Sequence, residues 1–147
     1  MSNLSEDQIA LIVSGVLKLG RSLRARRPAD SVSMSALSLM ATLNENGPMP
    51  AARLAEKVRL QPQSLTRLIQ DMEEKGLIAR SAGVEDKRTL LISLTQAGYE
   101  AFAYDIRARH AWLTQAMSEK LNGDEEVLLL MAAEVMSKLA APADIDD

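Results

Sequence analysis

The sequence contains no cysteine and only one histidine, His110, among its 147 residues. The missing cysteines exclude disulfides, thiolate metal sites and thiol-based redox sensing. A single histidine also argues against a histidine-based metal site. The chain has no evident pair of nucleophile and base and no glycine-rich phosphate loop, so we expect no enzymatic activity, no metal and no cofactor.

Aromatic residues are scarce as well, at 3% of the chain, whereas 47% of the residues are hydrophobic. Most of these are Ala, Leu and Met, which favour helices because unbranched side chains lose little rotamer freedom there. No apolar run approaches the roughly 20 residues of a membrane span, and the N-terminus lacks a basic region followed by an apolar one. We therefore expect a soluble, cytoplasmic globular protein with no membrane partner.

Charge is distributed unevenly along the chain, although the net charge is only −3. Residues 53–88 hold eight Lys and Arg against six Asp and Glu, a net charge of +2. Residues 119–147 hold two Lys against eight acids, a net charge of −6. A mildly basic middle permits DNA binding at one end of the molecule but does not by itself indicate it.

Capping residues and apolar spacing predict six helices. Ser5 and Gln8 form a capping box ahead of the first helix, and Thr95 caps the fifth. The run Arg24–Asp30, which contains Pro28, is interpreted as a polar break. Pro50 is placed to begin the third helix and Pro62 the fourth, which Gly76 closes. The expected helices cover about residues 6–24, 33–46, 50–58, 62–75, 96–120 and 125–139.

Strand signals are confined to two short segments, 77–80 and 89–94. In the second, Leu90, Ile92 and Leu94 alternate onto one side, as in a half-buried strand. The polar tip 81–88 joins the two segments, with Gly83 for the turn, so we expect a β-hairpin with a charged end. The sequence thus predicts a mainly α fold with one small hairpin.

The helix expected from Pro62 has the two faces that a DNA-reading helix needs. Its apolar stripe has the spacing i, i+3, i+4, i+7 and comprises Leu65, Leu68, Ile69 and Met72. Its opposite side is polar near the N-terminal end, where glutamine can pair with adenine and arginine with guanine or phosphate. The candidate contacts are Gln61, Gln63, Ser64, Thr66, Arg67 and Gln70.

The hairpin tip adds two further candidate contacts, Lys87 and Arg88. A basic tip can follow the DNA backbone, and an arginine can enter the narrow minor groove. Polar side chains opposite an apolar stripe are, however, also what an ordinary surface helix shows. Glu73 and Glu74 repel phosphate and favour an alternative, a winged-helix protein–protein interaction module without specific DNA binding.

Several motifs in register over about residues 34–100 resemble the MarR family of winged helix-turn-helix transcriptional regulators. They are Leu54-Ala55-Glu56, Ser64-Leu65-Thr66-Arg67-Leu68-Ile69, Glu74-Lys75-Gly76-Leu77-Ile78-Ala79-Arg80, Asp86-Lys87-Arg88, Leu90-Leu91-Ile92-Ser93-Leu94-Thr95 and Gly98. The resemblance implies a homodimer that binds a pseudo-palindromic operator in double-stranded DNA, with repression as the expected outcome. It also implies that Asp86 orients Arg88 for the minor groove.

Two positions of the wing depart from the family pattern. Lys87 stands where a second arginine is frequent, so this position can contact phosphate only as a point charge. Gly83 and Val84 stand where Asp-Pro is common, so we expect a wing tip that differs in shape from the family pattern and is more mobile.

The expected organisation is a winged helix-turn-helix region at 31–95, flanked by N- and C-terminal dimerisation helices. These helices lie within residues 1–30 and 96–141, and residues 142–147 are expected to be a disordered tail. The apolar residues 127–131 are consecutive, so their helix should be buried on all sides, which an intertwined dimer explains. Isologous pairing would place two recognition helices about 34 Å apart.

The resemblance further implies a small anionic aromatic effector bound between the dimerisation and DNA-binding parts. Arg21, Met34 and Trp112 are the candidate ligand residues, and Arg24 and His110 complete the shortlist. Each also has an ordinary structural explanation, Trp112 in the core or dimer interface and His110 on the surface.

Overall fold

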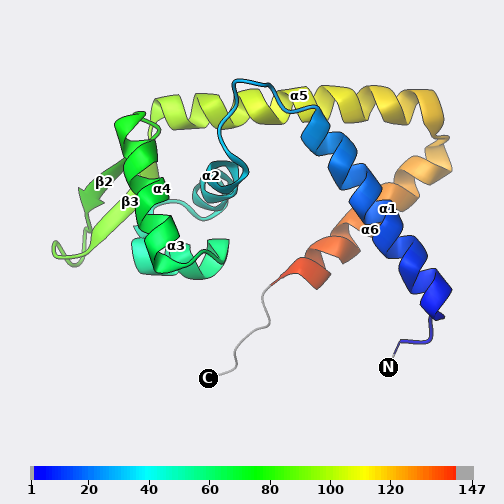
Figure 1. The fold of residues 1–147 in the computed structure, drawn as a ribbon, viewed down its shortest axis with the longest axis horizontal. Helices are drawn as coiled ribbons and strands as arrows, with labels where there is room; N and C mark the ends of the chain where they lie inside the picture. The colour runs from blue at the N-terminus through cyan, green and yellow to red at the C-terminus, as the bar shows by residue number, and fades with distance from the viewer. Residues whose placement is uncertain (1, 142–147) are drawn as a thin grey trace. The chain divides into compact units, whose positions relative to one another are not determined.

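The computed structural model describes residues 2–141, and the tail predicted at 142–147 lies outside the described residues. Within this part of the chain, six helices and three short strands follow one another (Figure 1). Their order is α1 (Glu6–Ala25), α2 (Met34–Asn46), β1 (Met49–Pro50), α3 (Ala51–Val58), α4 (Pro62–Glu74), β2 (Ile78–Ala82), β3 (Leu90–Leu94), α5 (Gln96–Lys120) and α6 (Gly123–Ala140). The predicted mainly α fold with a small β element is confirmed.

The chain divides into two compact units, Met1–Arg109 and His110–Asp147, so α5 continues from one unit into the other. This division differs from the predicted one, which begins the second dimerisation segment at residue 96. The function of each segment stays a prediction at this point.

Caps set the helix ends close to where the sequence places them. The amide of Gln8 donates to the Ser5 hydroxyl at 3.3 Å, and the Ser5 amide donates to the Gln8 side chain at 2.9 Å, which completes the predicted capping box. At the end of α4, Gly76 has a φ of 72°, the left-handed conformation that glycine adopts without strain. Its amide and that of Leu77 donate to the carbonyls of Glu73 and Met72, at 2.9 Å each.

The sheet has three antiparallel strands in the order β1-β3-β2. The predicted hairpin pairs Ile78 with Leu94, and β1, which was not predicted, pairs Met49 with Ile92. Two residues are too few to show an alternating pattern, and Pro50 lacks the amide that an inner strand needs. The prediction that Pro50 begins the third helix is wrong by one residue, because Pro50 adopts an extended conformation and precedes α3 as its N-cap.

The core of the first unit contains residues from α2, α3, α4 and the three strands. Leu65, Ile69 and Met72 of the predicted stripe are buried in it, and Leu68 packs beside them. The fully buried apolar side chains of largest volume are Leu39, Met40, Leu43, Leu54, Met72 and Ile92. Leu90 lies toward the hairpin tip and remains 52% exposed, so β3 extends beyond the core.

Helices α1 and α6 contain no buried residue within the described chain. Their large apolar side chains are instead exposed, for example Leu11 at 74% and Leu130 at 67%. Each helix therefore presents an apolar surface that the described part of the chain leaves uncovered. No helix within residues 2–141 combines the length and the hydropathy needed to cross a membrane.

Candidate nucleic-acid interface

The turn between α3 and α4 is made by a residue in an unusual conformation. Arg59 has a φ of 54° and is the one non-glycine residue with positive φ in the described chain. This left-handed conformation costs an ordinary residue about 1–2 kcal/mol. After the turn, Pro62 occupies the first turn of α4, where a missing amide costs nothing. Because Gln61 makes no side-chain cap, its exposed amide group is available to a partner outside the chain.

Helix α4 has the two faces that the sequence predicts. The six predicted contacts Gln61, Gln63, Ser64, Thr66, Arg67 and Gln70 are all exposed at or along this helix. The hydroxyl of Thr66 donates to the carbonyl of Pro62 at 2.9 Å. Thr66 can thus present its methyl group or a lone pair to DNA, but its proton is engaged. The exposed side of α4 combines amide, hydroxyl and guanidinium groups, the set that reads base edges in the major groove.

Two of the acids on α4 are neutralised within the chain. The Asp71 carboxylate lies 2.8 Å from the ammonium of Lys75, and the Glu73 carboxylate lies 2.7 Å from Nε of Arg80. The second pair also connects α4 to β2, a tie that sequence reasoning missed. Glu73 therefore weighs less against DNA binding than its charge alone indicates.

Several cations of residues 53–88 are exposed and have no ion-pair partner in the described part of the chain. They are Arg53, Lys57, Arg59, Arg67, Lys87 and Arg88. Each of the two ion pairs removes one charge of each sign, so the net charge of residues 53–88 stays at +2, and these six cations remain available to phosphate groups.

Thr95 and Gly98 join the end of α4 to the start of the hairpin and of α5. The Thr95 hydroxyl donates to the carbonyl of Gly76 at 2.6 Å and accepts from the amide of Gly98 at 3.0 Å. A Cβ atom on Gly98 would lie 2.1 Å from the carbonyl oxygen of Leu77. Only glycine allows the start of α5 to come this close to the backbone of Leu77. This contact fixes the position of α5 relative to the segment between α4 and the hairpin.

The hairpin tip is held by its own backbone. The amide of Gly83 donates to the Thr89 carbonyl at 2.8 Å, and a Cβ atom on Gly83 would lie 2.7 Å from the carbonyl oxygen of Asp86. The Asp86 carboxylate accepts from the backbone amide of Arg88 at 2.9 Å, and no ion pair joins these two side chains in the described chain. Asp86 thus positions the backbone of Arg88, while the Arg88 and Lys87 side chains remain exposed.

The shortlisted ligand residues are divided between the two compact units. Arg21, Arg24 and Met34 are exposed in the first, whereas exposed His110 and half-buried Trp112 belong to the second. This ligand set stays a prediction. Within residues 2–141, no three His, Cys, Asp or Glu side chains gather as a metal site would require.

Comparison with known proteins gives consistent matches over this architecture. The sequence profile of the MarR family matches residues 32–90, from the start of α2 to the hairpin. An HTH-type transcriptional regulator of Mycobacterium leprae is 36% identical over 124 residues, which are 84% of this chain and 86% of that protein.

Two further matches extend the comparison to function and fold. The HTH-type transcriptional repressor MdtR of Bacillus subtilis is 30% identical over 116 residues, which are 79% of this chain and 72% of MdtR. The crystal structure of a transcriptional regulator of Pseudomonas aeruginosa has a TM-score of 0.81 and 28% identity, covering 97% of this chain and 99% of that one.

Proposed function

This chain belongs to the MarR family and is a DNA-binding transcriptional regulator, not an enzyme, and from this premise we propose that it represses transcription as a homodimer on one pseudo-palindromic operator. The observation that carries the proposal is the exposed polar set at the N-terminal half of α4, beside six cations that have no ion-pair partner among residues 2–141. Repression is supported by MdtR, a relative that is named as a repressor. The cytoplasm, where such a regulator meets DNA, remains its expected location.

In this proposal, α4 enters the major groove and carries the direct base contacts. Gln63 and Gln70 pair with adenine, and Arg67 pairs with guanine. Ser64, Thr66 and the amide of Gln61 contact phosphate or sugar and so position the helix rather than specify sequence. The free amides at the start of α4 add a partial positive charge that favours phosphate.

The hairpin acts as a wing along the flanking minor groove. Lys87 contacts phosphate, and Arg88 enters the groove where it is narrow and its potential is most negative. Asp86 contributes by fixing the backbone at Arg88 through the bond of 2.9 Å to its amide.

The homodimer is supported by the uncovered apolar surfaces of α1 and α6. Exposed apolar side chains include Leu11, Ile12, Val13, Val16 and Leu17 on α1, and Val127, Leu128, Leu130, Met131, Val135 and Leu139 on α6. Patches of this kind on a chain of this size mark an interface with another protein. A second copy of the chain is the occupant we propose, because a pseudo-palindromic operator requires two equivalent DNA-binding lobes.

A small anionic aromatic effector that releases the DNA completes the proposal. Arg21 would supply the positive charge, and Met34 and Trp112 would supply apolar and aromatic surface. This part is supported if such a compound releases the wild-type chain from the operator but leaves an Arg21→Ala variant bound to it.

Selection of bound sites from random DNA tests the central proposal. We expect an enriched sequence with two inverted half-sites whose centres lie about one helical turn, or 10 base pairs, apart. Affinity for it should fall steeply with salt, because phosphate contacts release counterions. Failure to enrich any sequence, with binding equally weak at all salt concentrations, would favour the alternative of a winged-helix protein interaction module.

A further inference from the structure

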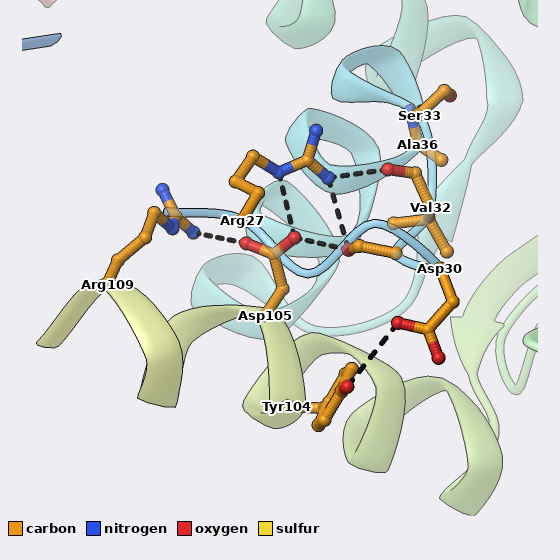
Figure 2. Close-up of polar contacts among 9 residues, drawn as sticks. Arg27, Asp30, Val32, Ser33, Ala36, Tyr104, Asp105 and Arg109 are labelled. Carbon is orange, nitrogen blue, oxygen red and sulfur yellow. Dashed lines mark hydrogen bonds and ion pairs between the residues drawn. The ribbon is translucent and has the colours of Figure 1, made fainter. Parts of the chain in front are cut away.

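A buried carboxylate ties together two segments that lie far apart in the sequence. Asp105 of α5 is 0% exposed, and its Oδ2 atom accepts from Nε of Arg27 at 2.8 Å and from the hydroxyl of Ser31. Nη2 of Arg27 also donates to the Ser31 hydroxyl at 3.3 Å and to the carbonyl of Val32. Figure 2 shows these contacts between α5 and the segment 26–33.

A second cation contacts the same carboxylate, but in a different way. Nη2 of Arg109 lies 3.0 Å from Oδ1 of Asp105, one turn along the same helix. Apart from this ion pair, Oδ1 of Asp105 has no hydrogen-bond partner in the described chain, and neither does the buried Nε of Arg109. The Arg109 contact is therefore local to α5, whereas the contacts of Arg27 and Ser31 with Asp105 join α5 to the segment 26–33 (Figure 2). An exposed contact, in which the Tyr104 hydroxyl donates to Asp30 at 3.4 Å, runs between the same two segments.

The position of this cluster in the chain gives it its significance. Helix α1 reaches the winged-helix lobe, residues 34–94, only through the segment 26–33, and α5 is the segment by which the chain leaves that lobe. Both covalent connections of the lobe thus pass through the cluster. A buried ion pair contributes little net stability, because desolvation offsets the attraction, whereas it can select one arrangement over others.

We propose that Asp105 and Arg27 are positioning residues for operator binding, which hold the winged-helix lobe in one orientation on α5 and so set the half-site spacing that the dimer accepts. The inference rests on the proposed function as a homodimeric operator-binding protein. With the tie intact, both lobes are presented together at the spacing of the operator. Without it, each lobe still reads its half-site. Binding two half-sites at once, however, must then fix the orientation of both lobes, a cost in conformational entropy that the wild-type chain does not have on binding.

Three variants separate this role from a general effect on the fold. Arg27→Met combined with Asp105→Leu removes both charges, and an apolar replacement of a buried ion pair is often neutral for stability. Arg109→Met is the matched control, because it removes a cation from the same carboxylate without cutting the tie. Arg27→Lys keeps the charge but lacks the planar fork that reaches Asp105 and Ser31 together. Thermal melting establishes which variants remain folded.

The experiment measures the affinity of each variant for a single half-site and for paired half-sites at several spacings. For the wild type and Arg109→Met, shifting one half-site by about half a turn of DNA, about 5 base pairs, should reduce affinity about 100-fold. For the double variant, the same shift should cost at most about fivefold, with binding at the original spacing about tenfold weaker and half-site affinity unchanged.

Three outcomes would overturn the inference. A folded double variant with the spacing profile of the wild type would overturn it while leaving the proposed function intact. If the double variant does not fold, Arg27→Lys decides, and an unchanged profile in that variant contradicts the role of Arg27. A wild-type chain that binds paired and single half-sites equally would overturn the proposed function, and this inference with it.

Discussion

Arg67 carries the sharpest expectation of any single residue, because an exposed guanidinium on the reading helix can bond two acceptors of one guanine. Arg67→Ala should reduce operator affinity by about 1–3 kcal/mol and relax the preference at one base pair. Titration of the selected operator and its single-base variants measures both effects. Arg107→Ala, at an exposed arginine of α5, is the matched control and should leave affinity unchanged. Unchanged binding after loss of Arg67 would contradict its assignment to the interface.

Asp86 allows a test of geometry against charge. Its carboxylate accepts from the amide of Arg88 at 2.9 Å, and asparagine can make the same bond through its side-chain carbonyl. Asp86→Asn should therefore bind A·T-flanked operators about as well as the wild type. Asp86→Ala loses the bond and should bind them about three- to tenfold more weakly. Equal losses in the two variants would show that the charge, and not the wing backbone, is what matters.

At the residue scale, the sequence could predict exposure along one helix but not partners from distant segments. The helical period placed Gln63, Arg67 and Gln70 on the exposed side of α4 correctly. It could not predict that Arg27, in a run interpreted as a polar break, bonds Asp105 across 78 residues. No local spacing contains that information, because it is the fold of the intervening winged-helix lobe that brings the two residues together.

At the scale of elements, predictions succeeded where several residues repeat one signal. Capping residues, prolines, glycines and apolar stripes placed the ends of the helices within about two residues, the usual uncertainty of helix boundaries. Strand β1 was not predicted because it consists of two residues, Met49 and Pro50, which are too few to show a periodic pattern. It exists because β3 offers an edge to pair with, and the hydrophobicity of Met49 draws it into the core.

Gly98 allows a prediction about how elements are joined. Gly98→Ala would place a Cβ atom 2.1 Å from the carbonyl oxygen of Leu77, and backbone cannot move aside as a side chain can. We expect a loss of stability of about 1–3 kcal/mol, as for an overpacked core, and a lower melting temperature. Gly123→Ala is the control, because nothing lies within 4 Å of a Cβ atom there. A melting temperature equal to that of the wild type would contradict the close approach of α5 to the hairpin.

At the scale of the whole molecule, the apolar composition of the last helix predicted burial that residues 2–141 of a single chain do not provide. The consecutive apolar residues 127–131 include Leu128, which is 64% exposed, and Leu130, which is 67% exposed. A sequence pattern indicates that a surface is buried but not whether the same chain or a second copy covers it. Because these side chains are exposed in one chain, they support a dimer.

The decisive prediction at this scale concerns assembly. Leu128→Lys combined with Leu130→Lys keeps good helix formers in α6 but makes burial of this surface costly. The variant should be monomeric by sedimentation and should bind the full operator about 100- to 10,000-fold more weakly, with half-site affinity retained. Added lysines attract DNA, so a loss of affinity cannot be assigned to charge repulsion. Leu90→Lys, at a residue of β3 that is 52% exposed, controls for the loss of an exposed leucine and should remain dimeric. A double variant that sediments as a dimer would remove α6 from the interface and leave α1 as the surface to test.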